Sequence, residues 1–226
     1  LKKFDGFGEA AGVAVLPNDR FAVGCKDGTL VVCSLTDGAV VRRFDKLPTA
    51  VHGLAATRDG QRLIAGTWVM ERNPPTGTAE AGWAPPEWAK PALVVVYDPD
   101  TGAVVHRKEV PGSVSHLTLS PDDKRVAFTT NDGYGVLDLG SGAVTLVGGA
   151  AARSVGVAFT PDGTRVLATG FTRGLVAWDV GGGKPKASDP LFAQHGYGVA
   201  VHPDGQRVAV VGHAGAGGVW TLPAEK

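Results

Sequence analysis

A strand–turn–strand pattern recurs five times along this chain and constrains its fold more than any other feature. Its clearest copy covers residues 159–179, with a Pro161-Asp-Gly turn and a Trp178-Asp ending. The arginine after each turn marks the period, with spacings of 42, 63, 40 and 42 residues between Arg20, Arg62, Arg125, Arg165 and Arg207. A period of this size with four short strands per unit is typical of propeller blades. The sequence therefore predicts an all-β fold, a β-propeller with five four-stranded blades.

Turn chemistry explains why each unit folds into a hairpin. Four of the five turns begin with proline, which fixes φ at the first corner, and most then carry Asp and Gly, which tolerate positive φ. The second and third strands of each unit are short continuous apolar runs, as in 63–65 and 93–97, which predicts cover on both faces by neighbouring blades. The fourth strands, 40–44 and 104–108, mix apolar and basic residues, as suits an outer edge.

These patterns predict one domain over residues 1–226. We place the blades at approximately 11–46, 51–110, 114–147, 154–192 and 197–222, the last completed by residues 1–6. Residues 1–6 match 41–46 almost position for position, so we expect the N-terminal strand to close the last blade. The chain begins with Leu1 and not Met, and we therefore expect further residues upstream.

Composition excludes several functional classes. Lys plus Arg equals Asp plus Glu at 22 each, so the basic excess of a nucleic-acid-binding protein is missing. No apolar run reaches the ~20 residues of a membrane span. The only cysteines, Cys25 and Cys33, are predicted to be buried thiols in neighbouring strands and not a disulfide. We expect no nucleic-acid partner, no membrane association and a cytoplasmic location.

At this point the chain resembles the WD-repeat β-propeller family in a degenerate, bacterial type. The Pro-Asp-Gly turns, the apolar second strands and Trp178-Asp179 carry the resemblance, with Tyr97-Asp98 and Leu137-Asp138 as weaker forms. The family's Gly-His pair is missing from every blade, although Asp27 and Asp132 occupy its aspartate position. The resemblance implies a non-catalytic scaffold for protein–protein interaction, as a module of a larger protein.

One segment, the Trp- and Pro-rich insertion at 70–90, interrupts the pattern. It lengthens a connection between second and third strands, and long loops of this kind are uncommon unless they are functional or disordered. Tryptophan is enriched at binding hot spots, although a lid packed on its own blade is an equally good interpretation. This connection and several histidine-bearing loops fall at one end of the strands. The candidate partner face comprises Trp68, Trp83, Trp88, His52, His116, Arg153, Arg173, Tyr197 and His213.

Two other functions remain open on the sequence. A propeller enzyme of lactonase or quinoprotein type would hold a ligand or metal at the central channel, with His116, His195, His213 and Asp132 as candidates. A small-ligand sensor would use the 70–90 segment as a lid. The sequence shows no metal-ligand cluster and no nucleophile motif, so we predict no catalytic residue, no metal and no cofactor, and a protein or peptide as partner.

Overall fold

The protein is an arc of antiparallel β-sheets. The computed structural model describes residues 7–68, 91–130, 133–148, 154–170, 174–182, 187–189, 196–212 and 217–222. Within these residues it has nineteen strands and no helix. The all-β prediction is confirmed.

Each predicted repeat forms one sheet whose strands follow one another in space as in sequence. The first sheet has β1 (Ala10–Leu16), β2 (Arg20–Cys25), β3 (Leu30–Ser34) and β4 (Val40–Arg43). The second has β5 (Ala50–Ala56), β6 (Leu63–Trp68), β7 (Ala92–Tyr97) and β8 (Val104–Val110). The third has β9 (Leu117–Leu119), β10 (Arg125–Thr130), β11 (Gly133–Asp138) and β12 (Val144–Gly148). The fourth has β13 (Ser154–Phe159), β14 (Arg165–Gly170), β15 (Gly174–Asp179) and β16 (Ala187–Asp189). The fifth has β17 (Gly196–Val201), β18 (Arg207–Gly212) and β19 (Gly217–Thr221).

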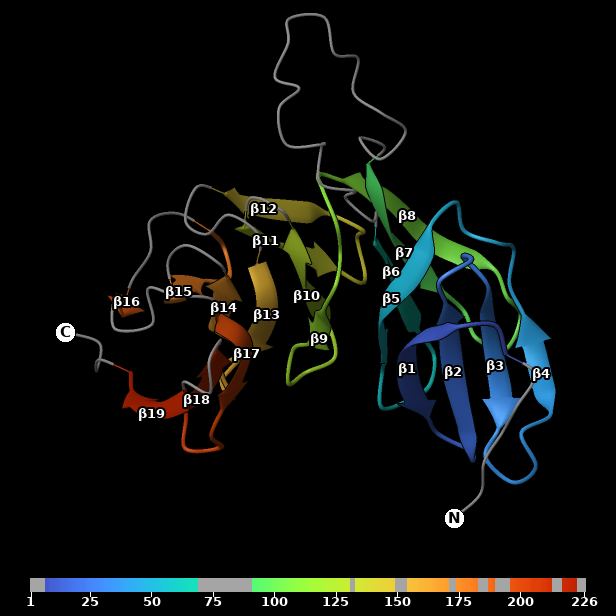
Figure 1. Ribbon diagram of the computed structural model, residues 1–226, viewed down its shortest axis with the longest axis horizontal. Helices are drawn as coiled ribbons and strands as arrows, with labels where there is room; N and C mark the ends of the chain where they lie inside the picture. Colours follow the sequence, from blue (N-terminus) through green and yellow to red (C-terminus); the bar gives the residue numbers. More distant parts are fainter. Residues whose placement is uncertain are drawn as a thin grey trace, which may run out of the picture.

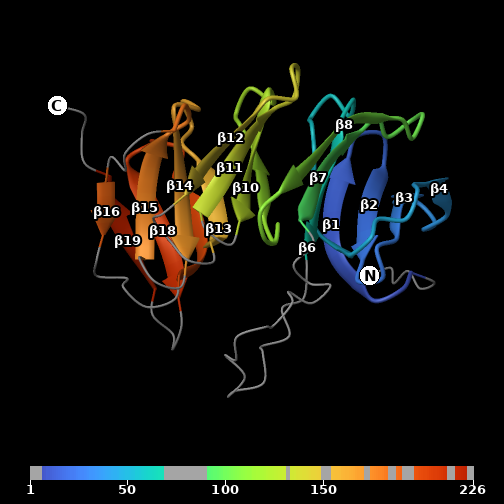
Figure 2. The ribbon, with the colours of Figure 1, turned by 90° about the horizontal axis from the view of Figure 1, so that it is seen from above.

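The sheets stand side by side in chain order, and the first and fifth lie at opposite ends of the arc (Figures 1 and 2). The predicted closed ring of five blades is therefore not confirmed. The closure of the last blade by residues 1–6 falls outside the described residues, and the described part of the fifth sheet has three strands. The single domain and its blade limits stay predictions.

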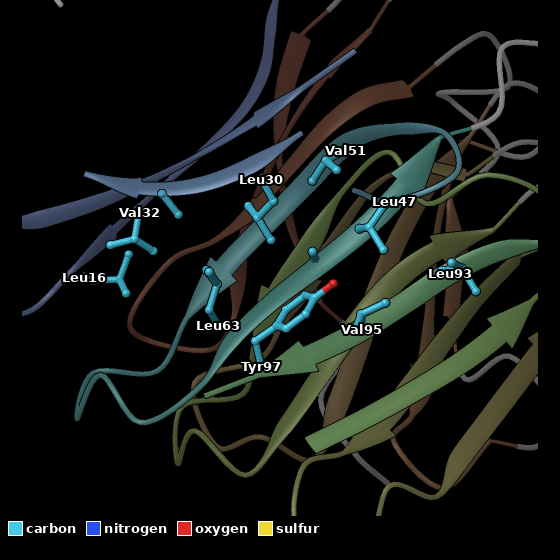
Figure 3. Close-up of a cluster of buried hydrophobic side chains, with 11 residues drawn as sticks. Leu16, Leu30, Val32, Leu47, Val51, Leu63, Leu93, Val95 and Tyr97 are labelled. Atoms are coloured by element: carbon cyan, nitrogen blue, oxygen red, sulfur yellow. The ribbon is translucent and has the colours of Figure 1, made fainter. Parts of the chain in front are cut away.

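Apolar residues between neighbouring sheets hold the arc together. Between the first and second sheets, a buried cluster joins both partners (Figure 3), with the members Leu16, Ala22, Leu30, Val32, Leu47, Val51, Leu63, Ala65, Leu93, Val95 and Tyr97. Three similar clusters join the second sheet to the third, the third to the fourth and the fourth to the fifth. Each fully buried side chain of this size contributes roughly 1.5–3 kcal/mol. In the second, third and fourth sheets the second and third strands are buried on both faces, as their apolar runs predict, because each of these sheets has a sheet on either side.

A second set of contacts joins the turns between first and second strands. Glycines at positive φ in three of these turns face the proline of the preceding turn. A Cβ on Gly60 would lie 3.1 Å from Pro17, and the same relation links Gly163 with Pro121 and Gly205 with Pro161. Between the second and third sheets, both members differ. Arg58 replaces the proline and Asp123, at φ 56°, replaces the glycine.

Arg58 and Asp123 form an ion pair in place of the glycine–proline contact. The backbone N–H and the Nε of Arg58 each donate to Asp123 Oδ2 at 2.9 Å. The guanidinium also donates to the carbonyl of Pro121. Arg58 and Asp123 both depart from the turn pattern, and the ion pair between them replaces the glycine–proline contact that the other sheet boundaries have.

Both cysteines are free and buried in the first sheet, as predicted. Burial raises the pKa of each thiol. The outer strands β4 and β8 expose much of their length, which agrees with the prediction of charged edge strands.

Candidate functional site

The innermost strands share one irregularity, and it positions the candidate site. In four sheets the pairing of the first strand with the second shifts by one residue near the start of the first strand. The residues left out of the pairing are Ala11, His52, Val155 and Tyr197. A β-bulge of this kind redirects a side chain and often lies beside functional sites. His52 and Tyr197 therefore occupy equivalent positions in the second and fifth sheets, at what we call the bulge end.

The residue after each bulge is glycine, because neighbouring inner strands approach closely there. A Cβ on Gly12 would collide with the carbonyl oxygen of His52. A Cβ on Gly156 would lie 3.1 Å from the Cα of Gly198. The Cβ of residue 156 would also lie 2.7 Å from Thr169 Oγ1, a distance that real Cβ atoms do not show, so these positions favour glycine.

The third sheet breaks this rule, and His116 stands where the others carry glycine. Leu117 pairs with Phe128, which places His116 opposite Thr129. The Thr129 hydroxyl accepts hydrogen bonds from the backbone N–H groups of Ser115 and His116, both at 3.1 Å. The Thr129 N–H donates to the carbonyl of His116, also at 3.1 Å. A side-chain hydroxyl thus replaces part of the ladder and holds the His116 backbone in place.

The His116 side chain is exposed, yet protein surrounds it closely enough to matter electrostatically. Partial burial lowers the pKa of His116 below its usual value. A neutral imidazole at the bulge end can donate one hydrogen bond and accept another.

His52 lies against Trp68 at the same end. Their ring centroids are 5.1 Å apart, with an angle of 58° between the planes. Trp68 is the last residue of β6 and pairs with Ala50 at the start of β5. Both residues are partly buried, so each keeps some accessible surface.

The structure thus places four of the nine predicted face residues at the same end of their sheets: His52, Trp68, His116 and Tyr197. Of these, His52 and Trp68 are in contact. The other five, Trp83, Trp88, Arg153, Arg173 and His213, lie outside the described residues. So do Asp132, His195 and His213, which the enzyme alternative requires in addition to His116, and the 70–90 segment, which the sensor alternative requires. Sequence reasoning missed Ser115 and Thr129, whose role depends on strand register and has no motif.

The opposite end, which we call the turn end, carries most of the described aspartates and two histidines in structural roles. Asp59, Asp122 and Asp162 each accept a hydrogen bond from the hydroxyl before their turn, at 2.5 to 2.6 Å. This bond is the main reason that the pKa of each carboxyl is lowered. His106 contacts the carbonyl of Leu139 at 3.0 Å, and His202 lies beside Asp204. These aspartates lie in the turns, as the turn pattern in the sequence predicts.

Asp27, in the family's aspartate position, also has a structural role. Its carboxylate accepts hydrogen bonds from the N–H and hydroxyl of Thr29, both at 3.0 Å, and from Lys46 at 2.9 Å. The Lys46 bond is the largest of several influences that lower the pKa of Asp27 to about 2. The residue ties the connection after β2 to the segment that leads into the next sheet.

Among the described residues, no three His, Cys, Asp or Glu side chains come together in a group that could hold a metal ion. A search of the same residues finds no helix with the length and apolar character needed to cross a membrane.

Comparison with known proteins finds similarity in structure alone. The chain matches no protein-family model and no curated protein. It is similar to the computationally designed protein Ika8, with a TM-score of 0.73 and 18% identity over 95% of this chain and 58% of that one. It is also similar to the β-propeller domain of Cps50 (Swd1) from Myceliophteria thermophila, with a TM-score of 0.74 and 15% identity over 97% of this chain and 67% of that one. A chain of the mitotic checkpoint complex gives a TM-score of 0.72 and 14% identity over 94% of this chain and 61% of that one.

This likeness supports a β-propeller fold, as the repeat pattern predicts. At these identities it shows the fold alone. The chain spans 58% to 67% of the length of these three solved chains.

Proposed function

We propose that this protein is a non-catalytic scaffold for protein–protein interaction, and that it binds a protein or peptide at the bulge end of its inner strands. The observation that supports this most is the placement of His52, Trp68, His116 and Tyr197, from three different sheets, at the same end of their strands. The sheets that carry them are separate in sequence, so only the repeat architecture explains their common level.

These side chains suit a polypeptide ligand. Tyr197 in the fifth sheet is 45% exposed, and His116 at the start of the third sheet is also exposed. Tyrosine and tryptophan bury large areas and keep one polar atom for a hydrogen bond, which is why they are enriched at interfaces. The bulges and the Thr129 bonds fix the backbone beneath these rings, so little conformational freedom is lost when a partner binds.

The comparisons support this proposal by analogy of fold. One similar chain belongs to the mitotic checkpoint complex, a multi-protein assembly by its name. A shared fold does not define a partner, so the site residues have to carry the test.

The test introduces a photo-crosslinking amino acid at Tyr197 and, as a matched control, at His202 on the turn end. Both positions are exposed. We expect a specific crosslinked polypeptide from Tyr197 and none from His202. The purified partner is then titrated against His116→Ala and Tyr197→Ala, with Leu146→Ala on the outer strand β12 as control. A loss of affinity of at least tenfold in both site variants, with the control unchanged, supports the proposal. Equal crosslinking from both ends, or full affinity in both site variants, contradicts it.

A further inference from the structure

The fifth sheet has an uncovered apolar face. In each of the other four described sheets, the corresponding face is covered by the next sheet along the chain. We define the open face by Ala209, Val211 and Val219, on the side away from the fourth sheet. Val211 is 58% exposed and Val219 is 70% exposed. With Val13 and Val15 on β1, they are the four most exposed large hydrophobic side chains among the described residues. Val211 and Val219 lie on the same face of the sheet as Ala209. Val211 is two residues from Ala209 along β18, and Val219 of β19 pairs with Ala209.

The first sheet shows what normally covers such a face. Ala22 pairs with Val32 there, as Ala209 pairs with Val219 in the fifth sheet. Ala22 and Val32 are fully buried. The residues over them come from the second sheet, namely Leu63, Ala65, Leu93 and Val95. The fifth sheet therefore presents the same two side chains without the sheet that buries them in the first.

Size complementarity across the sheet boundaries describes the missing neighbour further. Gly24 faces Val51 of the second sheet, and a Cβ on Gly24 would lie 2.6 Å from that valine. Gly66 faces Val114 of the third repeat in the same way. In both of these pairs, glycine lies on the earlier sheet and valine on the later one. Between the fourth and fifth sheets, the larger residue lies on the earlier sheet and glycine on the later one.

At that boundary Thr169 of the fourth sheet faces Gly196 of the fifth, and a Cβ on Gly196 would lie 2.8 Å from the Cβ of Thr169. A large residue on one sheet thus requires glycine on the next. Val211 occupies the position of Gly24 and Thr169 in the repeat. A neighbour of the fifth sheet would therefore carry glycine where the second sheet has Val51.

We propose that the open face is a docking surface for a further four-stranded blade of this repeat. The occupant presents leucine, alanine and valine at the positions of Leu63, Ala65 and Val95, and glycine at the position of Val51. Its contact with Ala209, Val211 and Val219 continues the series of boundaries that joins the first five sheets. This goes beyond the scaffold function and does not depend on it.

The test grafts a sixth blade onto the chain. A copy of residues 36–97 joined after Leu222 continues the repeat in register, because Leu35 and Leu222 make the same backbone bond, to Asp19 and Gln206 respectively. One graft carries Val51→Gly in the copy, and the matched control keeps this valine. A third chain carries a copy of residues 181–222, which has Gly196 at the required position. The reporter is Val219→Cys, labelled with a thiol reagent, with Val41→Cys on β4 as the exposed reference.

We expect labelling of Val219→Cys to slow at least tenfold in the Val51→Gly graft and in the 181–222 graft. Labelling should change much less in the valine-retaining control, while Val41→Cys stays fast in all chains. Unchanged labelling in both glycine-bearing grafts overturns the proposal. The proposal is also overturned if labelling of Val219→Cys in the ungrafted chain becomes slower as the protein concentration rises. A second copy of this chain would then be the occupant.

If the grafts do not fold, hydrogen exchange of the ungrafted chain decides. Amides of β18 should exchange faster than those of β14, whose sheet is covered on both faces. Equal protection of the two strands would refute an uncovered docking surface.

Discussion

The compensated change at Arg58 and Asp123 makes a quantitative prediction about how the blades hold their register. We consider Arg58→Pro, Asp123→Gly and the double variant, which restores the glycine–proline contact of the other turns. Arg58→Pro alone removes both hydrogen bonds to Asp123 Oδ2. The arginine side chain is 73% exposed, so its ion pair contributes only about 1 kcal/mol after solvent screening. The carboxylate is 19% exposed and loses its donors, which adds roughly 1 kcal/mol.

Asp123→Gly behaves differently, because two effects oppose each other. It loses the ion pair, about 1 kcal/mol, and relieves a left-handed backbone, which costs roughly 1–2 kcal/mol for a residue with a Cβ. We expect a net change near zero. In the double variant no carboxylate is left without donors, and proline restricts the unfolded chain by roughly 0.4–1 kcal/mol. The double variant should be at least as stable as the parent.

Guanidinium unfolding of the four proteins measures the coupling directly. We expect Arg58→Pro to lose about 1 to 1.5 kcal/mol, because its proline also restricts the unfolded chain. The double variant should recover this loss, with a coupling of about 2 kcal/mol, well above the usual deviation from additivity of ~0.5 kcal/mol. An additive cycle would refute the reasoning, since it would mean that the two residues do not form one contact.

Three further predictions concern buried or bonded polar groups. Tyr134 is buried, and its hydroxyl has no hydrogen-bond partner among the described residues. Tyr134→Phe should therefore raise the free energy of unfolding by about 1 kcal/mol, and a lower value than in the parent protein would contradict this. Asp27→Asn should lower Tm at pH 7, because the folded pKa of Asp27, about 2, lies below the usual aspartate value of 3.8. The stabilisation is lost as the carboxylate is protonated, so the Tm difference should shrink as the pH falls from about 4 to below 2. A Tm difference that stays the same over this range would count against the Lys46 pair. Thr129→Val leaves two backbone N–H groups without their acceptor. The free energy of unfolding in urea should fall by roughly 1–3 kcal/mol, and the NMR signals of His116 should shift. Unchanged stability would show that the hydroxyl is dispensable.

The sequence predicts the sheets well because their signals are local. Proline and glycine set each turn within a few residues, and short apolar runs define strands that need cover on both faces. The period then places the sheets in chain order. Whether the arc closes could not be predicted in the same way, because closure depends on small rotations accumulated over all sheets.

The candidate site was predictable only in part. His52, His116 and Tyr197 could be assigned to one end of the strands from strand order. Their common level depends on the bulges, which result from pairing between strands and leave no residue motif. The exchange of glycine for His116 becomes visible only when the register puts it opposite Thr129.

The central claim is that a partner binds at the bulge end, and hydrogen exchange with and without the bound partner tests it most directly. The account predicts slowed exchange at the starts of β5 and β17, at residues 115–117, and at the end of β6, with no change at the turns around Asp59, Asp122 and Asp162. Protection confined to those turns, with the bulge end unchanged, would contradict it.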